Sequence, residues 1–171
     1  ISGSRWSSLS GSAKHRSLSL KKSSATMSGQ KGHPMPTSLV MSPFGEFLGI
    51  EIESFGEGKA LCSIAVKPHH FNAGGRVHGG VLTSLADSCA GVAVRSLRPE
   101  GVASATTDLN IAFIRPPMGN RLEAEAEVLH AGKRLYRVEM CVFSMTLGEN
   151  QTRKLVAKCN ATFMLVFPTN A

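Results

Sequence analysis

The sequence predicts an α+β fold in which one antiparallel sheet packs against one long helix. Three observations lead to this prediction. The stretch from Val77 to about Leu97 carries apolar residues at helical spacing. Six other segments have the alternation or the β-branched and apolar content of strands, with Gly and Pro at the turns between them. The total length of 171 residues fits a single domain.

The elements are expected in a fixed order along the chain. Ser42-Pro43 introduces a short helical turn, because Pro is favoured at the start of a helix. Two strands follow and are joined at Gly56-Glu57-Gly58, and a loop then leads into the long helix, which ends before Pro99. The predicted strands cover residues 48–56, 59–67, 103–115, 122–130, 134–146 and 154–167.

The net charge of +7 is concentrated near the beginning of the chain. Residues 1–45 contain six Lys or Arg and no acid, whereas residues 46–171 contain 13 basic and 12 acidic residues. We therefore expect residues 1–36 to form a disordered, basic, Ser-rich tail and residues 37–171 to form the folded domain. The tail fits a mitochondrial transit segment, sequence upstream of the native start, or a plain extension. Because the domain itself is nearly neutral, nucleic acid is not an expected partner.

Membrane insertion and secretion are not expected. No apolar run reaches the ~18 residues of a membrane helix, and no apolar core of a secretory signal is present. The expected location is therefore the cytoplasm or the mitochondrion. Four cysteines occur without a C-x-x-C motif, which predicts buried thiols in a reducing compartment.

The long helix contains one acid, Asp87, which is the only charged residue between Arg76 and Arg95. Its neighbours three and four positions away are small, namely Thr83, Ser84, Ala90 and Gly91. A carboxylate among apolar groups costs free energy unless it is used. Two interpretations stay open at this point: an acid bonded to a nearby hydroxyl on an exposed face, or a functional acid.

The start of the helix favours the functional interpretation. Four glycines lie between Gly74 and Gly80, and they leave the first backbone N–H groups uncovered at the positive end of the helix dipole. Such a terminus stabilises an oxyanion, and together with Asp87 it predicts an ester-like hydrolytic site. A metal site is not expected, because no cysteine or carboxylate joins the nearby histidines His69, His70 and His78 in a recognisable zinc set.

Two motifs together resemble a known family. Asn72-x-x-Gly75-x-x-His78-Gly79-Gly80 followed by Leu82-x-x-Leu85-x-Asp87 is similar to the hotdog-fold acyl-CoA thioesterases of the phenylacetate-pathway (PaaI-like) type. The segments Thr106-x-Asp108-x-Asn110 and Phe113-Ile114-Arg115-Pro116 look like the next strand of that family. The resemblance covers about residues 40–167. It implies a hotdog fold, in which the antiparallel sheet wraps around the helix.

The resemblance also implies roles for individual residues. Asp87 would act as the general base that activates water or as the nucleophile, and the Gly79 N–H would polarise the thioester oxygen. Asn72 would help to hold that oxygen or the water, Thr106 would orient the water, and His78 would support the loop. Asn72 and Asp87 would come from opposite subunits, so a homodimer is required, and a homotetramer is expected.

The expected substrate is an acyl-CoA, with coenzyme A as part of the substrate and no separate cofactor. In the family, basic residues at the turn after Gly132 contact the nucleotide, which implies this role for Lys133 and Arg134. Gly80 and Arg137 are further candidates for binding coenzyme A, and Arg76 and Arg115 are weaker ones.

Two other functions remain open from the sequence. One is a hotdog domain that binds acyl-CoA as a sensor without hydrolysing it, although such a protein would have no need for Asp87. The other is a hotdog acyl hydratase or dehydratase, whose site pairs a His with an acid in a different motif. Here His78 leads directly into two glycines, which favours thioester hydrolysis.

Overall fold

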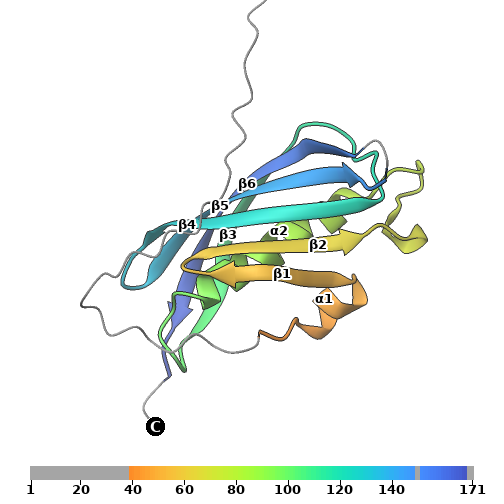
Figure 1. The fold of residues 1–171 in the computed structure, drawn as a ribbon. Coiled ribbons are helices and arrows are strands. Elements are labelled where there is room, and N and C mark those ends of the chain that lie inside the picture. The colour runs from red at the N-terminus through yellow and green to blue at the C-terminus, as the bar shows by residue number, and fades with distance from the viewer. Residues whose placement is uncertain (1–38, 149–150, 169–171) are drawn as a thin grey trace, which may run out of the picture. The chain divides into compact units, whose positions relative to one another are not determined.

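The computed structural model describes residues 39–148 and 151–168 (Figure 1). The tail predicted over residues 1–36 lies outside this part, as do Glu149 and Asn150 of the last predicted turn. The described residues form a six-stranded antiparallel sheet and one long helix, which confirms the predicted α+β fold. The elements are α1 (Pro43–Phe47), β1 (Ile50–Gly56), β2 (Lys59–Ala65), a 3₁₀ turn η1 (Pro68–His70), α2 (Gly79–Arg95), β3 (Ala103–Phe113), β4 (Arg121–Ala131), β5 (Leu135–Thr146) and β6 (Thr152–Val166).

The strands are ordered β1-β2-β4-β5-β6-β3, so β3 forms one edge of the sheet although it follows α2 in the chain. Helix α2 lies against one face of the curved sheet, which is called the inner face below (Figure 1). The apolar spacing that predicted this helix also predicted its buried side, since Leu82, Leu85, Cys89 and Val92 are each at most 2% exposed.

The alternation in β4 separates the two faces of the sheet. Leu122, Ala124 and Ala126 are buried on the inner face, and the three glutamates between and after them lie on the outer face. There Glu123 and Glu125 form ion pairs with Arg153 of β6. One prediction fails on this face: Cys141 is only half-buried on the outer side of β5, whereas the other three cysteines are buried. Its neighbours in β5, Met140 and Val142, take the inner positions.

The predicted helix begins two residues too early. Val77 forms an isolated antiparallel bridge with Phe71, so it is extended rather than helical. His78 follows in an extended conformation as the N-cap, and α2 begins at Gly79. Val77 continued the apolar pattern of the helix because its side chain is also buried, 7% exposed. An apolar residue predicts burial, but it does not show whether the backbone at that position is helical or extended.

Strand β3 contains a bulge. Thr106 pairs with Phe163 and Asp108 pairs with Thr162, so Thr107 is an extra residue between two consecutive pairs. The Thr107 hydroxyl donates a hydrogen bond to the Thr162 carbonyl at 3.1 Å. The bulge allows Thr106 and Leu109 to face α2 although they are an odd number of positions apart.

Helices in the described ranges are too short or too polar to cross a bilayer.

Candidate active site at the start of helix α2

The loop before α2 is folded by the side chain of Asn72. Its Oδ1 accepts hydrogen bonds from the backbone N–H groups of Gly74 at 2.9 Å and Arg76 at 3.1 Å. Its own N–H donates to the Arg76 carbonyl at 2.7 Å. Because Oδ1 accepts the bonds from Gly74 and Arg76, the side-chain NH₂ group of Asn72 is the part of the amide that can donate to a ligand. Asn72 is exposed.

The first two glycines of α2 differ in their hydrogen bonds. The Gly80 N–H donates to Nδ1 of His78 at 2.9 Å, so the N-cap side chain occupies it. A Cβ on Gly80 would lie 2.9 Å from that same nitrogen, which explains the need for glycine there. In the described residues the Gly79 N–H has no hydrogen-bond acceptor. Gly79 therefore offers a free donor at the positive end of the helix dipole, whereas Gly80 does not.

Asp87 is half-buried in the middle of α2, and Thr106 of β3 donates a hydrogen bond to its Oδ1 at 2.8 Å. The bulge at Thr107 is what turns Thr106 toward the helix. The structure therefore brings together two of the predicted site residues from segments 19 positions apart. The other carboxylate oxygen of Asp87 has no bonded partner in the described part of the chain.

The structure does not bring Asp87 to Gly79 within one protomer. Asp87 lies eight positions after Gly79 in the same helix, and at 1.5 Å per residue this separates them by about 12 Å along the axis. Asn72 and His78 lie at the Gly79 end. The predicted residues therefore form two groups: Asn72, His78 and Gly79 in one, and Asp87 with Thr106 in the other.

The predicted basic residues also lie away from the start of α2. Lys133 and Arg134 are exposed on the turn between β4 and β5. The register places this turn at the same end of the sheet as the first residues of β3, opposite the end where β2 leads toward α2 (Figure 1). Arg137 lies on the outer face and donates to the Thr162 hydroxyl. Within one protomer, none of these three side chains is near Gly79.

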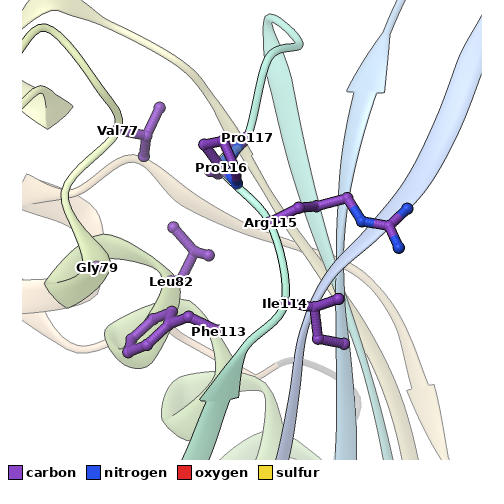
Figure 2. A pocket seen from close by; sticks show the side chains of 8 residues that line it. All are labelled: Val77, Gly79, Leu82, Phe113, Ile114, Arg115, Pro116 and Pro117. Carbon is purple, nitrogen blue, oxygen red and sulfur yellow. The ribbon is translucent and has the colours of Figure 1, made fainter. Parts of the chain in front are cut away.

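A cavity of about 360 Å³ lies beside the start of α2, on the side of the segment that follows β3. Its lining is apolar except for one arginine: Val77, Gly79, Leu82, Phe113, Ile114, Arg115, Pro116 and Pro117. Figure 2 shows the Phe113 ring beneath Gly79 and Leu82, while the Arg115 side chain extends away from them. An added Cβ at Gly79 would lie 3.2 Å from the Phe113 ring. The free Gly79 N–H therefore lies next to an apolar wall.

Sequence reasoning did not identify this wall. Phe113 was part of a family motif but had no role, and its partner Gly79 lies 34 positions away. Phe113 is the last of the alternating inner-face residues of β3, so the sequence pattern does not distinguish it from a core residue. Its side chain is 56% exposed in the structure.

Side chains suited to a metal ion do not gather in the described ranges, where no three His, Cys, Asp or Glu residues form a group. The deeply buried thiols of Cys89 and Cys159 are poor nucleophiles. The pKa of Cys159 is raised to about 11 by burial, and the pKa of the free Cys89 thiol is raised by a hydrogen bond with the neighbouring Cys62 thiol and by burial.

Comparisons with known proteins point to one family. A family model described as the thioesterase superfamily matches residues 74–150. The acyl-coenzyme A thioesterase PaaI of Escherichia coli is 39% identical over 113 residues, which are 64% of this chain and 73% of that protein. Human acyl-coenzyme A thioesterase 13 is 32% identical over 117 residues, which are 67% of this chain and 79% of that protein.

A solved structure has a similar fold. A Bacillus halodurans protein, solved with CoA, has a TM-score of 0.65 and 26% sequence identity, and the match covers 75% of this chain and 81% of that one.

Proposed function

Since this chain belongs to the thioesterase superfamily and is a thioester hydrolase with a hotdog fold, we propose that it hydrolyses acyl-CoA to a free carboxylic acid and CoA with Asp87 and the Gly79 N–H. The relationship to PaaI confirms the resemblance found in the sequence. The observation that carries the proposal is the half-buried Asp87, held by the Thr106 hydroxyl and left with one free carboxylate oxygen.

The proposed chemistry needs only a base and an oxyanion donor. Asp87 takes a proton from water while the water oxygen attacks the thioester carbonyl. The Gly79 N–H donates to the oxyanion that forms, beside an apolar wall. The tetrahedral intermediate then collapses, the C–S bond breaks, and the CoA thiolate leaves and takes up the proton. In the alternative, the Asp87 carboxylate itself attacks the thioester carbonyl and displaces the CoA thiolate.

The site requires two copies of the chain. One protomer separates Gly79 and Asp87 by about 12 Å along α2, so a single thioester does not reach both. Strand β3 lies at a sheet edge, has 11 residues and carries one charge, Asp108, which is little protection for an edge. Antiparallel pairing of two β3 strands places the Thr106 half of one copy beside the Phe113 half of the other. This arrangement joins the two groups of site residues.

The same pairing supplies the basic residues. Lys133 and Arg134 lie at the end of the sheet where β3 begins. In the proposed dimer this end faces the partner's start of α2. The partner's acyl-CoA would then have cations within reach of its phosphates, with Arg137 beyond them on the outer face. Further pairing of dimers into a homotetramer is proposed from the family resemblance.

The experiment that tests the proposed function measures thiol release from acyl-CoA esters. The panel contains short, medium and long acyl chains and a phenylacetyl ester. We expect the wild-type chain to release CoA from at least one member and the Asp87→Ala protein to lose this activity. Wild-type binding of acyl-CoA without turnover would instead support a sensor. Hydration of an unsaturated acyl-CoA without thiol release would support a hydratase.

A single-turnover reaction in H₂¹⁸O distinguishes the two roles of Asp87. If Asp87 is the base, the product acid contains ¹⁸O from its first turnover. If Asp87 is the nucleophile, it displaces the CoA thiolate and forms an acyl–aspartyl anhydride, and water that attacks the Asp87 carbonyl of this anhydride leaves ¹⁸O in the enzyme while the Asp87 ¹⁶O enters the first product. ¹⁸O in the enzyme therefore assigns the nucleophilic role to Asp87.

A complementation experiment tests the shared site. Asn72→Ala and Asp87→Asn proteins are each expected to be inactive alone. In a heterodimer, one site contains the intact Asn72 of one chain and the intact Asp87 of the other. Co-expression should therefore restore about a quarter of wild-type activity, because half the dimers are mixed and each has one intact site. No recovery would mean that both residues act within one chain.

A further inference from the structure

His70 is completely buried, with 0% exposure, although it lies in a short turn at the molecular surface. Both of its ring nitrogens bond to the backbone. Nδ1 accepts a hydrogen bond from the Lys67 N–H at 3.0 Å, and Nε2 lies 3.1 Å from the Leu48 carbonyl. Leu48 caps α1 and is 22 positions away in the chain. The ring therefore ties the loop before α2 to the segment that precedes β1.

The hydrogen bonds fix the form of the imidazole. Because the partner of Nδ1 is an N–H donor, Nδ1 has no proton, and Nε2 carries the proton that it donates to Leu48. Burial lowers the pKa of His70, and the nearby charges of His69 and Lys67 lower it further, against the opposite effect of the Leu48 carbonyl. His70 is therefore a neutral link with one defined orientation.

The backbone of His70 extends this link to the candidate active site. Its carbonyl accepts a hydrogen bond from the His78 N–H at 2.8 Å. His78 is the N-cap of α2, and its side chain accepts from Gly80. Gly79 therefore lies between His78 and Gly80, the two residues that this hydrogen bond joins. A continuous series of bonds therefore runs from the Leu48 carbonyl through the His70 ring and backbone to the residues on either side of the Gly79 N–H.

We propose that His70 is a positioning residue that acts through His78 to fix the direction of the Gly79 N–H. This inference rests on the proposed function, because the direction matters only if Gly79 is the oxyanion donor. Small displacements have large effects in such a site, since an error of about 1 Å can cost roughly 10²-fold in rate. His69, the next residue toward the N-terminus, is exposed and contacts the His70 ring edge to face, with 4.2 Å between ring centroids, but it forms none of the hydrogen bonds of this series. His69→Ala therefore serves as the control that removes the ring contact and keeps the hydrogen bonds.

Two conservative substitutions separate the two ring nitrogens. In His70→Gln the side-chain amide takes the place of Nε2 and can still donate to Leu48. In His70→Asn the side-chain oxygen takes the place of Nδ1 and can still accept from Lys67, but the link to Leu48 is lost. We expect the Asn protein to lose tenfold to roughly 10²-fold in kcat, with KM within about twofold of the wild-type value. The Gln protein should recover much of this loss, and His69→Ala should match the wild type.

A purely structural role predicts a different result. Melting temperatures would then fall in both His70 proteins, while kcat, measured well below those temperatures, would stay at the wild-type value. That outcome would overturn the proposal, as would a loss in His70→Asn that appears in KM alone.

A second measurement does not depend on turnover. The backbone amide resonances of Gly79 and Gly80, observed by ¹⁵N NMR, should shift in His70→Asn and stay in place in His69→Ala. Unchanged resonances in His70→Asn would overturn the inference even if the chain is an active thioesterase. If the wild-type chain releases no thiol from any ester and these resonances still shift, the proposed function fails while the link from His70 to Gly79 stands.

Discussion

Thr106 donates a hydrogen bond through Oγ1 to Oδ1 of Asp87 at 2.8 Å, and this bond joins the edge strand β3 to the middle of α2. The acid in the middle of α2, whose other charged residue is Arg95 at the last position, is thus stabilised by one hydroxyl from another element. The second carboxylate oxygen of Asp87 stays available. Two adjacent threonines, Thr106 and Thr107, and two acids, Asp87 and Asp108, allow matched tests of this hydrogen bond.

Replacing Asp87 by Asn should lower kcat by about 10²–10⁴-fold, the usual contribution of a general base. The amide keeps the size of the side chain but does not accept the proton from water. Steady-state thiol release measures the effect. Asp108→Asn is the control, because Asp108 is exposed on the outer face of the same strand as Thr106. An equal loss in both proteins would mean that the change in charge, rather than the site, is responsible.

Replacing Thr106 by Val should lower kcat roughly tenfold, since a hydrogen bond to a charged group contributes about 1.5 kcal/mol at the lower end of its range. Thr107→Val removes a neighbouring hydroxyl, whose bond goes to the Thr162 carbonyl instead. That protein should be slightly less stable and retain its activity. Kinetics and thermal melts of the two proteins together check the assignment, which is wrong if Thr107→Val is the more damaging for kcat.

Replacing Gly79 by Ala should lower kcat/KM at least tenfold with little effect on stability. The new Cβ would lie 3.2 Å from the Phe113 ring, and this ring is 56% exposed and free to move. It would move into the cavity where the substrate is proposed to lie. Adding Phe113→Leu should restore part of the activity, because the smaller side chain accepts the methyl group. Independent effects of the two changes in a double-mutant cycle would contradict the contact.

Replacing Gly119 by Ala should destabilise the fold by about 3 kcal/mol or more. Its Cβ would lie 1.9 Å from the Met145 carbonyl oxygen, which belongs to a strand and does not yield. Gly91→Ala is the contrasting change: the nearest atom is 3.9 Å away, so the gain in helix propensity should stabilise by about 0.5–1 kcal/mol. Urea unfolding of both proteins measures the difference. A change in the free energy of unfolding with the same sign in both proteins would refute the packing argument.

Acid stability should depend on Glu53. The Ser63 hydroxyl, which donates to it at 2.6 Å, and the nearby Arg121 hold the pKa of this carboxyl below its usual value. A lowered pKa in the folded state stabilises the protein above the ordinary Glu value of about 4.3. The contribution is lost as pH falls through the lower, folded value. Denaturant titrations should show a flatter acid dependence for Glu53→Gln than for the wild type. Glu51→Gln is the matched control, because Glu51 is an exposed residue of the same strand.

The sequence was sufficient to predict features that repeat along the chain. The spacing of Leu82, Leu85 and Cys89 predicted α2, and the alternation of Glu and Ala predicted β4. Asp87 was identified because it is the only acid in an uncharged stretch, a property of the sequence itself.

Features that depend on contacts between distant segments could not be predicted. His69 and His70 are adjacent and chemically identical in the sequence, yet only His70 is buried against Leu48. The sequence made Gly79 the candidate oxyanion donor and Gly80 a candidate for binding coenzyme A, but it did not show that the His78 side chain occupies the Gly80 N–H. The remoteness of Lys133 from Gly79 follows from the strand register, which a single sequence does not specify.

The extra residue Thr107 shifts by one position which residues of β3 face the inside of the sheet. Before it, the inner positions supply the hydroxyl that bonds to Asp87, and after it, they supply the core contacts of Leu109 and the cavity wall at Phe113. Without the bulge, a regular ladder through the same residues would place Thr107 on the inner face and turn Thr106 to the outside of the sheet, because Thr106 and Leu109 are an odd number of positions apart. The position of the bulge thus decides which of two adjacent threonines offers its hydroxyl to the helix, without any change at Asp87.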